Sequence, residues 1–359
     1  MEELYGLYGE NIKLGYAHKV INQDRFIYPI LGLKLDKNSI LKVGYVDFVD
    51  SNYLFNNIID KELQSDFLFI NEFNKVTTFA VIDLRKYNNY KNICKDGNNS
   101  LALQILKQTI GALYLAIYSK QKSPDCERKI VISNKAILEV EEGLNSYMSI
   151  YNGKYMICPN IVSEELVAKN IDYDMDSIKD VLEILKKDFK YKTDYEKKIC
   201  KTLEIIYSIY NEGYSSERVI KWAIALNYIF RENDEHEFDS TYIGRKLRII
   251  FNVIDKKEIY QNLPKYIFKE PKKTRKISGI VISVYKSVRN DLMHGKIDFY
   301  TEYGICNVEE LLILKVTVHE LLKFMTKDEY IKKFKNIKEF SEFIEAKEAE
   351  NIRIRKQNK

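Results

Sequence analysis

The sequence lacks the cysteine and histidine spacing that builds disulfide frameworks and zinc sites. Five cysteines are scattered over 359 residues without a CxxC pair, and none of the four histidines stands at ligand spacing from them. This pattern disfavours a disulfide-stabilised secreted domain and a structural zinc module. We therefore expect a protein of a reducing compartment that needs no metal ion or cofactor.

The sequence also shows no targeting segment and no membrane-spanning segment. The first residues, MEELYGLYGENIK, are acidic and polar, whereas a signal peptide begins with basic and apolar regions. No apolar run approaches the roughly 18 to 20 residues of a membrane span. These absences predict a cytoplasmic protein that makes no contact with a membrane.

The composition is that of a globular protein with two domains. Hydrophobic residues make up 45% of the chain and charged residues 30%, which leaves enough apolar material to bury a core. Two domains are the natural expectation at this length. The pattern places a mixed α/β domain in residues 1–160, an all-α domain in residues 161–326 and a charged helical tail in residues 327–359, so the expected fold class is α+β.

Short runs rich in Ile, Leu, Tyr and Val predict strands in the first domain. The turn sequence DKNS predicts a hairpin between Phe26–Leu35 and Ile40–Val49, and a second pair is expected between Asp66–Phe73 and Val76–Leu84. Residues 1–160 contain no glycine-rich phosphate loop, nucleophile elbow or HExxH sequence, which disfavours an active site there.

Helical spacing dominates the rest of the chain. Leu101–Ser119 is too long and too continuous for a strand, and after Pro159 almost every segment has the apolar spacing of a helix. The segment Val219–Phe230 is nearly all apolar except Lys221 and Asn227, which predicts a central helix. Further strands and helices are expected at Lys129–Ser133, Tyr155–Cys158, Asp176–Leu185, Thr193–Tyr210, Ser240–Val253, Ile277–Met293 and Asn307–Met325.

Positive charge is concentrated in the segment that leads up to the helix expected at Ile277–Met293 and into that helix. Residues 241–290 hold 13 Lys and Arg against 3 Asp and Glu, an excess of ten. Such a block favours a polyanionic partner. The alternative is that lysine-rich helices simply carry solvated faces.

The sequence RNDLMHG, residues 289–295, ends the helix that this basic block leads into. Arg289 carries a permanent charge on a planar fork that binds phosphate, and His294 can both take and give a proton near neutral pH. Such a pair can activate a ribose 2′-hydroxyl, protonate the leaving oxygen and stabilise the phosphorane without a metal ion. The alternative is a histidine that caps the helix dipole beside a solvated arginine.

Helix geometry separates the two catalytic candidates. On a regular helix Asn290 and His294 share a face, whereas Arg289 is rotated from His294 by about 140°. The two could converge if His294 lies in the unwinding last turn beside Gly295, or a second copy of the helix could supply the missing partner. A two-fold dimer through the 277–294 helix would bring two Arg/His pairs into one cleft. We therefore expect a homodimer with a composite site.

The motif and its surroundings resemble a known family. The pattern Arg289-Asn290-x3-His294, with WAIAL at residues 222–226 and RKLRIIF at residues 245–251, is similar to HEPN-domain ribonucleases, most of all to the ApeA-like branch of antiphage and abortive-infection systems. The resemblance covers about residues 163–325. It implies a helical bundle that dimerises through the motif helices and cleaves RNA without a metal ion, with the arginine and histidine essential and Asn290 as an orienting group.

Other residues take their expected roles from this resemblance and from their charge. ApeA-like sequences often carry an acid in the central helix where this chain has Asn227, so Glu232 or Asp234 would have to replace it. His319, inside an apolar helix, is expected to be a packed, hydrogen-bonded histidine. RNA contacts are expected from Lys272, Lys273, Arg275, Lys276, Lys286 and Lys296, for which an ordinary surface position is the alternative.

Together these patterns predict a metal-independent endoribonuclease of a defence or toxin-like system. RNA is its expected substrate, and the N-terminal domain is expected to act as a sensor or autoinhibitor for a trigger ligand or protein. The alternative is a non-catalytic module that dimerises and binds RNA, a nucleotide or a partner protein.

Overall fold

The computed structural model has helices and an antiparallel sheet, as the α+β expectation requires. The chain divides into two compact units, with Met1–Thr109 and Arg128–Ile171 in unit 1 and Ile110–Glu127 and Asp172–Lys359 in unit 2. The structure describes residues 4–5, 11–12, 25–58, 77–87, 98–120, 129–132, 148–151, 154–157, 169–211, 215–232, 240–253, 285 and 308–357.

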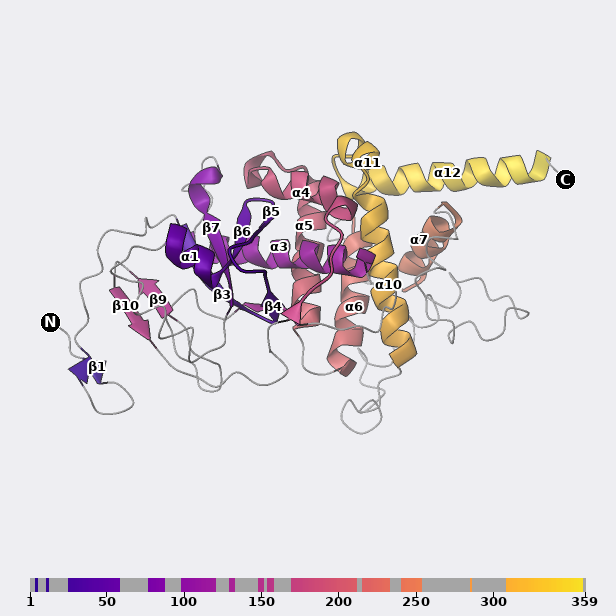
Figure 1. The fold of residues 1–359 in the computed structure, drawn as a ribbon. Coiled ribbons are helices and arrows are strands. Elements are labelled where there is room, and N and C mark those ends of the chain that lie inside the picture. The colour runs from indigo at the N-terminus through magenta and orange to yellow at the C-terminus, as the bar shows by residue number, and fades with distance from the viewer. Residues whose placement is uncertain are drawn as a thin grey trace. The chain divides into compact units, whose positions relative to one another are not determined.

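A five-stranded antiparallel sheet forms the centre of unit 1, in the order β5-β6-β7-β3-β8 (Figure 1). Strands β3 and β7, two of the three inner strands, are buried on both faces, as the low exposure of Ile27, Tyr28, Phe79 and Ala80 shows. The strands of this sheet are β3 (Arg25–Leu31), β5 (Ile40–Val43), β6 (Val46–Asp50), β7 (Thr78–Asp83) and β8 (Val131–Ile132).

The hairpin expected between Phe26–Leu35 and Ile40–Val49 is wrong. The second run is itself a hairpin, because Gly44 takes a positive φ of 64° and turns β5 back onto β6, with Val43 opposite Val46. Strand β3 pairs instead with β7, where Tyr28 lies opposite Ala80, and with β8. The predicted strand at 66–73 lies outside the described residues.

Smaller elements complete unit 1. Asp50 ends β6 and caps helix α1 by accepting the backbone N–H groups of Asn52 and Tyr53. These elements are β1 (Leu4–Tyr5), β2 (Asn11–Ile12), β4 (Leu33–Lys34), α1 (Ser51–Asn57), a 3₁₀ turn (Leu84–Lys86), β9 (Met148–Tyr151), β10 (Lys154–Ile157) and β11 (Lys169–Asn170).

Helix α3 (Asn98–Lys120) confirms the helix expected at Leu101–Ser119. By length and mean hydropathy its segment Ser100–Lys120 could cross a membrane, which corrects the expectation that no apolar run is long enough. Most of this segment is buried inside the protein, as it is in the core helix of a soluble protein.

The described part of unit 2 is almost entirely helical. Helices α5, α6 and α10 lie side by side, with α6 in contact with both neighbours (Figure 1). Local sequence signals mark where these helices begin. At the start of α5, for example, Thr193 and Glu196 form a capping box. The helices are α4 (Lys179–Lys186), α5 (Asp194–Tyr210), α6 (Ser215–Phe230), α7 (Ser240–Val253), α10 (Val308–Met325), α11 (Asp328–Lys333) and α12 (Ile337–Gln357), with 3₁₀ turns at Asp176–Ile178 and Phe189–Tyr191.

The two units differ from the expected domains in one important respect. Residues 110–127, which the sequence pattern places in the first domain, belong to unit 2. There α3 comes so close to α5 that a Cβ atom on Gly111 would lie 2.1 Å from the carbonyl oxygen of Leu203. One helical turn further on, Tyr114 stacks on Tyr210 of α5 with ring centroids 3.9 Å apart.

The charged tail also belongs to unit 2 and is not one helix. Helix α11 ends at Lys333, and α12 begins at Ile337 after an extended Phe334. Phe334 and Phe340 are buried and contact the ring of Tyr195 on α5, so the tail is held by an aromatic cluster.

Candidate functional site

The residues predicted to cleave and bind RNA lie outside the described residues and stay predictions. Within the predicted 277–293 helix the structure describes Tyr285, which is helical and fully buried. Tyr285 is therefore the residue of this predicted helix whose contacts with the rest of unit 2 can be described. The residues outside the described part are Arg289, Asn290, His294, Lys286, Lys296, Lys272, Lys273, Arg275 and Lys276.

Tyr285 is bonded to the central helix of the bundle. Its hydroxyl donates a hydrogen bond to Oδ1 of Asn227 on α6, and both residues are buried. On α6 Asn227 is surrounded along the chain by buried apolar residues, among them Leu226 and Ile229. A buried amide without a partner is unfavourable, so this bond matters to the packing of Tyr285 against α6.

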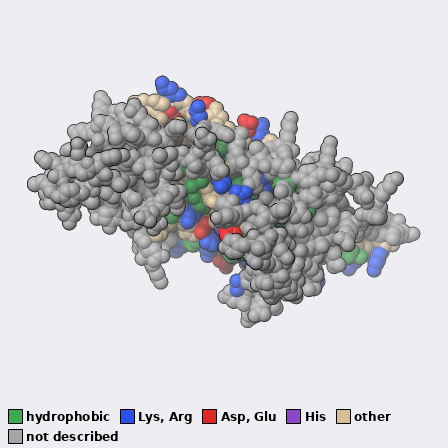
Figure 2. Space-filling model, turned by 90° about the horizontal axis from the view of Figure 1, so that it is seen from below, with side chains coloured by type: hydrophobic (Ala, Val, Ile, Leu, Met, Phe, Trp, Pro, Cys, Tyr) green, Lys and Arg blue, Asp and Glu red, His purple; other side chains and the backbone are tan. Residues whose placement is uncertain are grey.

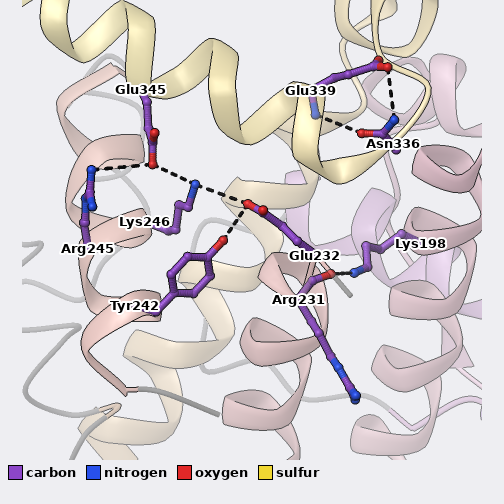
Figure 3. Close-up of polar contacts among 9 residues, drawn as sticks. All are labelled: Lys198, Arg231, Glu232, Tyr242, Arg245, Lys246, Asn336, Glu339 and Glu345. Atoms are coloured by element: carbon purple, nitrogen blue, oxygen red, sulfur yellow. Dashed lines mark hydrogen bonds and ion pairs between the residues drawn. The ribbon is translucent and has the colours of Figure 1, made fainter. Parts of the chain in front are cut away.

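The C-terminal end of α6 is held by a side chain from α5. Nζ of Lys198 on α5 donates to the carbonyl oxygen of Arg231, just beyond the last residue of α6 (Figure 3). A lysine at the carbonyl end of a helix also complements the helix dipole. Burial and the nearby charge of Arg231 together lower the pKa of Lys198 to about 8, although the charge of Glu232 acts in the opposite direction.

His319 on α10 is a packed, hydrogen-bonded histidine, as expected. Its Nδ1 lies 2.8 Å from the carbonyl oxygen of Lys315 and its Nε2 lies 3.4 Å from the hydroxyl of Tyr210. A carbonyl only accepts, so Nδ1 carries the proton and Nε2 accepts from the tyrosine. The rings of Tyr118 and Trp222 lie 4.4 and 5.2 Å from the imidazole and shield it from water.

This enclosure keeps the imidazole of His319 neutral. Burial lowers its pKa to about 3, although the hydrogen bond to Lys315 acts in the opposite direction. A histidine that does not titrate between pH 5 and 8 is a poor general acid or base at neutral pH. His319 therefore supports the fold of unit 2 and leaves His294 as the candidate for proton transfer.

We expect His319 to make the protein less stable in mild acid. The unfolded chain takes up a proton near pH 6.5 but the folded chain does not until about pH 3, so stability present above pH 6.5 is lost as the pH falls towards 3. Between pH 6.5 and 5 the loss is about 2 kcal/mol. Urea unfolding of the wild type and of His319→Gln over this range measures it, and equal slopes for the two proteins would contradict the assignment.

A second polar cluster joins α7 to the C-terminal helix α12. Nζ of Lys246, which is 4% exposed, lies 3.4 Å from Glu232 and 2.9 Å from Glu345, and the hydroxyl of Tyr242 donates to Glu232 over 2.6 Å (Figure 3). Arg245 approaches Glu345 from the exposed side at 3.9 Å. Burial alone would raise the pKa of Glu232, but the Tyr242 bond and the Lys246 charge together hold it below its usual value.

This cluster bears on two expectations from the sequence. Glu232, one of the two acids considered as a replacement at the site, is engaged by Tyr242 and Lys246. Arg245 and Lys246, which belong to the basic block, both have carboxylate partners. On the face drawn in Figure 2 the described Lys and Arg side chains are likewise interspersed with Asp and Glu. Within the basic block, Lys246 is therefore paired with two carboxylates of the protein itself.

Replacing Lys246 by methionine is expected to lower the free energy of unfolding by about 2 kcal/mol, because Glu232 and Glu345 lose their shared cation. The value is below that of a fully buried pair because Glu345 is partly exposed. Arg245→Met is the matched control on the same helix and should cost about 0.5 kcal/mol or less. If urea unfolding shows the same loss of free energy for both variants, Lys246 contributes no more to stability than the exposed Arg245.

Sequence reasoning missed Tyr285 and Lys246, although a signal for each is present. Asn227 is a polar amide inside an apolar helix, which requires a buried donor from another segment. Lys246 stands on the buried stripe of α7 with Ile243, Leu247 and Ile250. In both cases the signal shows that a partner exists but does not identify it.

Among the described residues, no group of three or more His, Cys, Asp or Glu side chains is placed to hold a metal ion. Comparisons with protein-family models, with curated proteins and with solved structures find no match to this chain.

Proposed function

We propose that this chain is a metal-independent endoribonuclease, the effector of a defence or toxin-like system, which cleaves RNA at a composite site formed by two copies. The observation that carries the proposal is the pair Arg289 and His294 at the end of a segment whose Tyr285 is helical and buried. The arginine would bind and stabilise the reacting phosphate. The histidine would move the proton.

The arrangement of unit 2 supports a HEPN-like bundle. Helices α5, α6 and α10 pack together, and the motif segment is joined to α6 through the bond from Tyr285 to Asn227. Both features are consistent with the motif resemblance.

The proposal is tested with the full-length protein in EDTA. Purified wild-type protein is incubated with total RNA or tRNA beside Arg289→Ala and His294→Ala variants. Cleavage by the wild type that both variants lose supports the nuclease. Binding of RNA without cleavage by any of the three proteins would favour the non-catalytic module instead.

The intact chain is the right material for this assay. Removing residues 1–160 to release an inhibited nuclease would also remove the second part of α3, where the hydroxyl of Tyr118 donates to Glu320 on α10 over 3.0 Å. Loss of activity after such a deletion would report damage to unit 2. Inhibition by unit 1 is better sought with point substitutions in its sheet.

A further inference from the structure

The 3₁₀ turn Phe189–Tyr191, just before α5, reverses the usual order of burial. Tyr191 is 63% exposed, the highest value of any large hydrophobic side chain in the described part of the chain. Lys192, the next residue, is only 6% exposed. An aromatic ring is ordinarily buried and a lysine is ordinarily left in water. A local reversal of this kind is typical of a functional position.

Buried residues on either side of Tyr191 anchor the turn. Asp188 is buried, and its carbonyl oxygen accepts the backbone N–H of Tyr191 over 2.9 Å. Nζ of Lys192 lies 5.8 Å from the ring centroid of the half-buried Phe189. Burial lowers the pKa of Lys192, and the nearby charges of Glu196 and Asp188 act in the opposite direction. The exposed ring of Tyr191 is therefore carried by a turn whose neighbouring residues are fixed in the core.

Two exposed lysines lie at the same end of the bundle as this ring. Nζ of Lys190 lies 5.9 Å from the centroid of the Tyr191 ring. The carbonyl oxygen of Lys335, between α11 and α12, accepts the backbone N–H of Tyr195 over 2.9 Å, which places Lys335 at the first turn of α5. Both lysines are exposed, and neither forms an ion pair with another described residue.

An exposed ring with such lysines beside it fits single-stranded RNA better than a protein partner. Asp194, the exposed acid nearest to Tyr191 in the chain, is already paired with Lys197 at 3.0 Å, so it does not offset the charge of Lys190. Bases of a single strand stack on aromatic rings while lysines bind the phosphates between them. The core of a protein–protein interface is instead depleted of lysine.

We propose that Tyr191, Lys190 and Lys335 form a binding surface for single-stranded RNA, in which one base stacks on the Tyr191 ring and adjacent phosphates bind the two ammonium groups. The flexible stem of a lysine lets its ammonium group move from the ring to a phosphate. The inference rests on the proposed function, because that function supplies RNA as the substrate. The surface holds the RNA and takes no part in the chemical step.

Tyr191→Ala is expected to weaken the binding of single-stranded RNA by about 5-fold or more, which is the contribution of one stacked base. Fluorescence anisotropy of a labelled RNA with 2′-O-methyl riboses measures this in the full-length protein, because such an RNA cannot be cleaved through its 2′-hydroxyl groups. Tyr191→Phe keeps the ring and should bind as the wild type does. Ile352→Ala removes another exposed apolar side chain of unit 2 and is the matched control. Wild-type affinity in Tyr191→Ala would overturn the inference.

The salt dependence of binding tests the two lysines. Lys190→Ala and Lys335→Ala should each reduce the slope of log K against log salt concentration by about 0.7, because each removes one phosphate contact. Lys186→Ala is the control, since the ammonium group of Lys186 is paired with Glu183 at 2.7 Å and its loss should leave the slope unchanged. An unchanged slope in both of the first two variants would contradict the proposed surface.

A duplex of the same sequence separates stacking from general attraction between charges. Paired bases cannot stack on the ring, so Tyr191→Ala should change the affinity for the duplex by less than about 2-fold. Equal losses for duplex and single strand would mean that no base stacks on Tyr191. The melting temperature of Tyr191→Ala should stay within about 2 °C of the wild type, because the ring is exposed.

These readouts distinguish the binding surface from the nuclease. If the wild type cleaves RNA but Tyr191→Ala binds the methylated RNA as tightly as the wild type, the surface is wrong and the nuclease stands. If the wild type binds the methylated RNA through Tyr191 but does not cleave ordinary RNA, the nuclease is wrong and the surface stands. A wild type that neither binds nor cleaves RNA overturns both.

Discussion

Replacing Arg289 or His294 by alanine is expected to reduce metal-free RNA cleavage by about 10²- to 10⁴-fold. A positioned acid or base contributes a factor of this size, and a fixed charge on the developing phosphorane contributes a similar one. Single-turnover cleavage of a labelled RNA in EDTA measures the change in the chemical step directly. Both variants should still bind RNA, because neither removes the other basic residues.

Two further variants sharpen this prediction. Arg289→Lys keeps the charge but removes the planar fork, so it should also cleave poorly if the arginine grips a phosphate through two hydrogen bonds. His236→Ala removes a histidine outside the motif and should cleave at the wild-type rate. Cleavage at the wild-type rate by either alanine variant at 289 or 294 would falsify the composite site. Sedimentation of the wild type should show the dimer that the site requires.

The largest loss of stability is expected from Gly111→Ala. In most helices this change is favourable by about 0.5 to 1 kcal/mol, because alanine restricts the unfolded chain. Here the new Cβ would lie 2.1 Å from the carbonyl oxygen of Leu203, and a backbone atom cannot move aside as a side chain can. We expect a net loss of about 3 kcal/mol or more in the free energy of unfolding.

Urea unfolding followed by circular dichroism measures this loss. Lys107→Ala is a control in the same helix, at a half-buried position, and should change stability by about 0.5 kcal/mol or less. Equal stability of Gly111→Ala and the wild type would mean that α3 and α5 are not in close contact at this point. The result therefore tests the contact between Gly111 and Leu203 within unit 2.

The helices of unit 2 were largely predictable from the sequence alone. Helices α5, α6, α7 and α10 begin and end within a few residues of their expected bounds, and α3 does so as well. The reason is that apolar periodicity and caps are local, so each helix carries its own signals. The expected packing of His319 followed from the same kind of pattern.

Strand pairing was not predictable in the same way. A run such as Ile40–Val49 satisfies the composition of one strand, yet Gly44 divides it into two strands that pair with each other. Strand β3 does not pair with either of these two strands. It pairs with β7, some 50 residues further along the chain. Partner choice in a sheet depends on contacts between distant segments, which a local pattern does not contain.

For the candidate site, the sequence by itself determined which side chains could carry the proposed chemistry. The tertiary structure decided which buried contacts form in unit 2. Arginine and histidine are identified by residue type and spacing, because charge and proton exchange belong to the side chains themselves. That Asn227 bonds Tyr285, that Lys246 joins two acids, and that α3 serves both units became visible only in the folded chain. Each depends on segments far apart in the sequence, and buried polar groups need partners within the protein because water does not reach them.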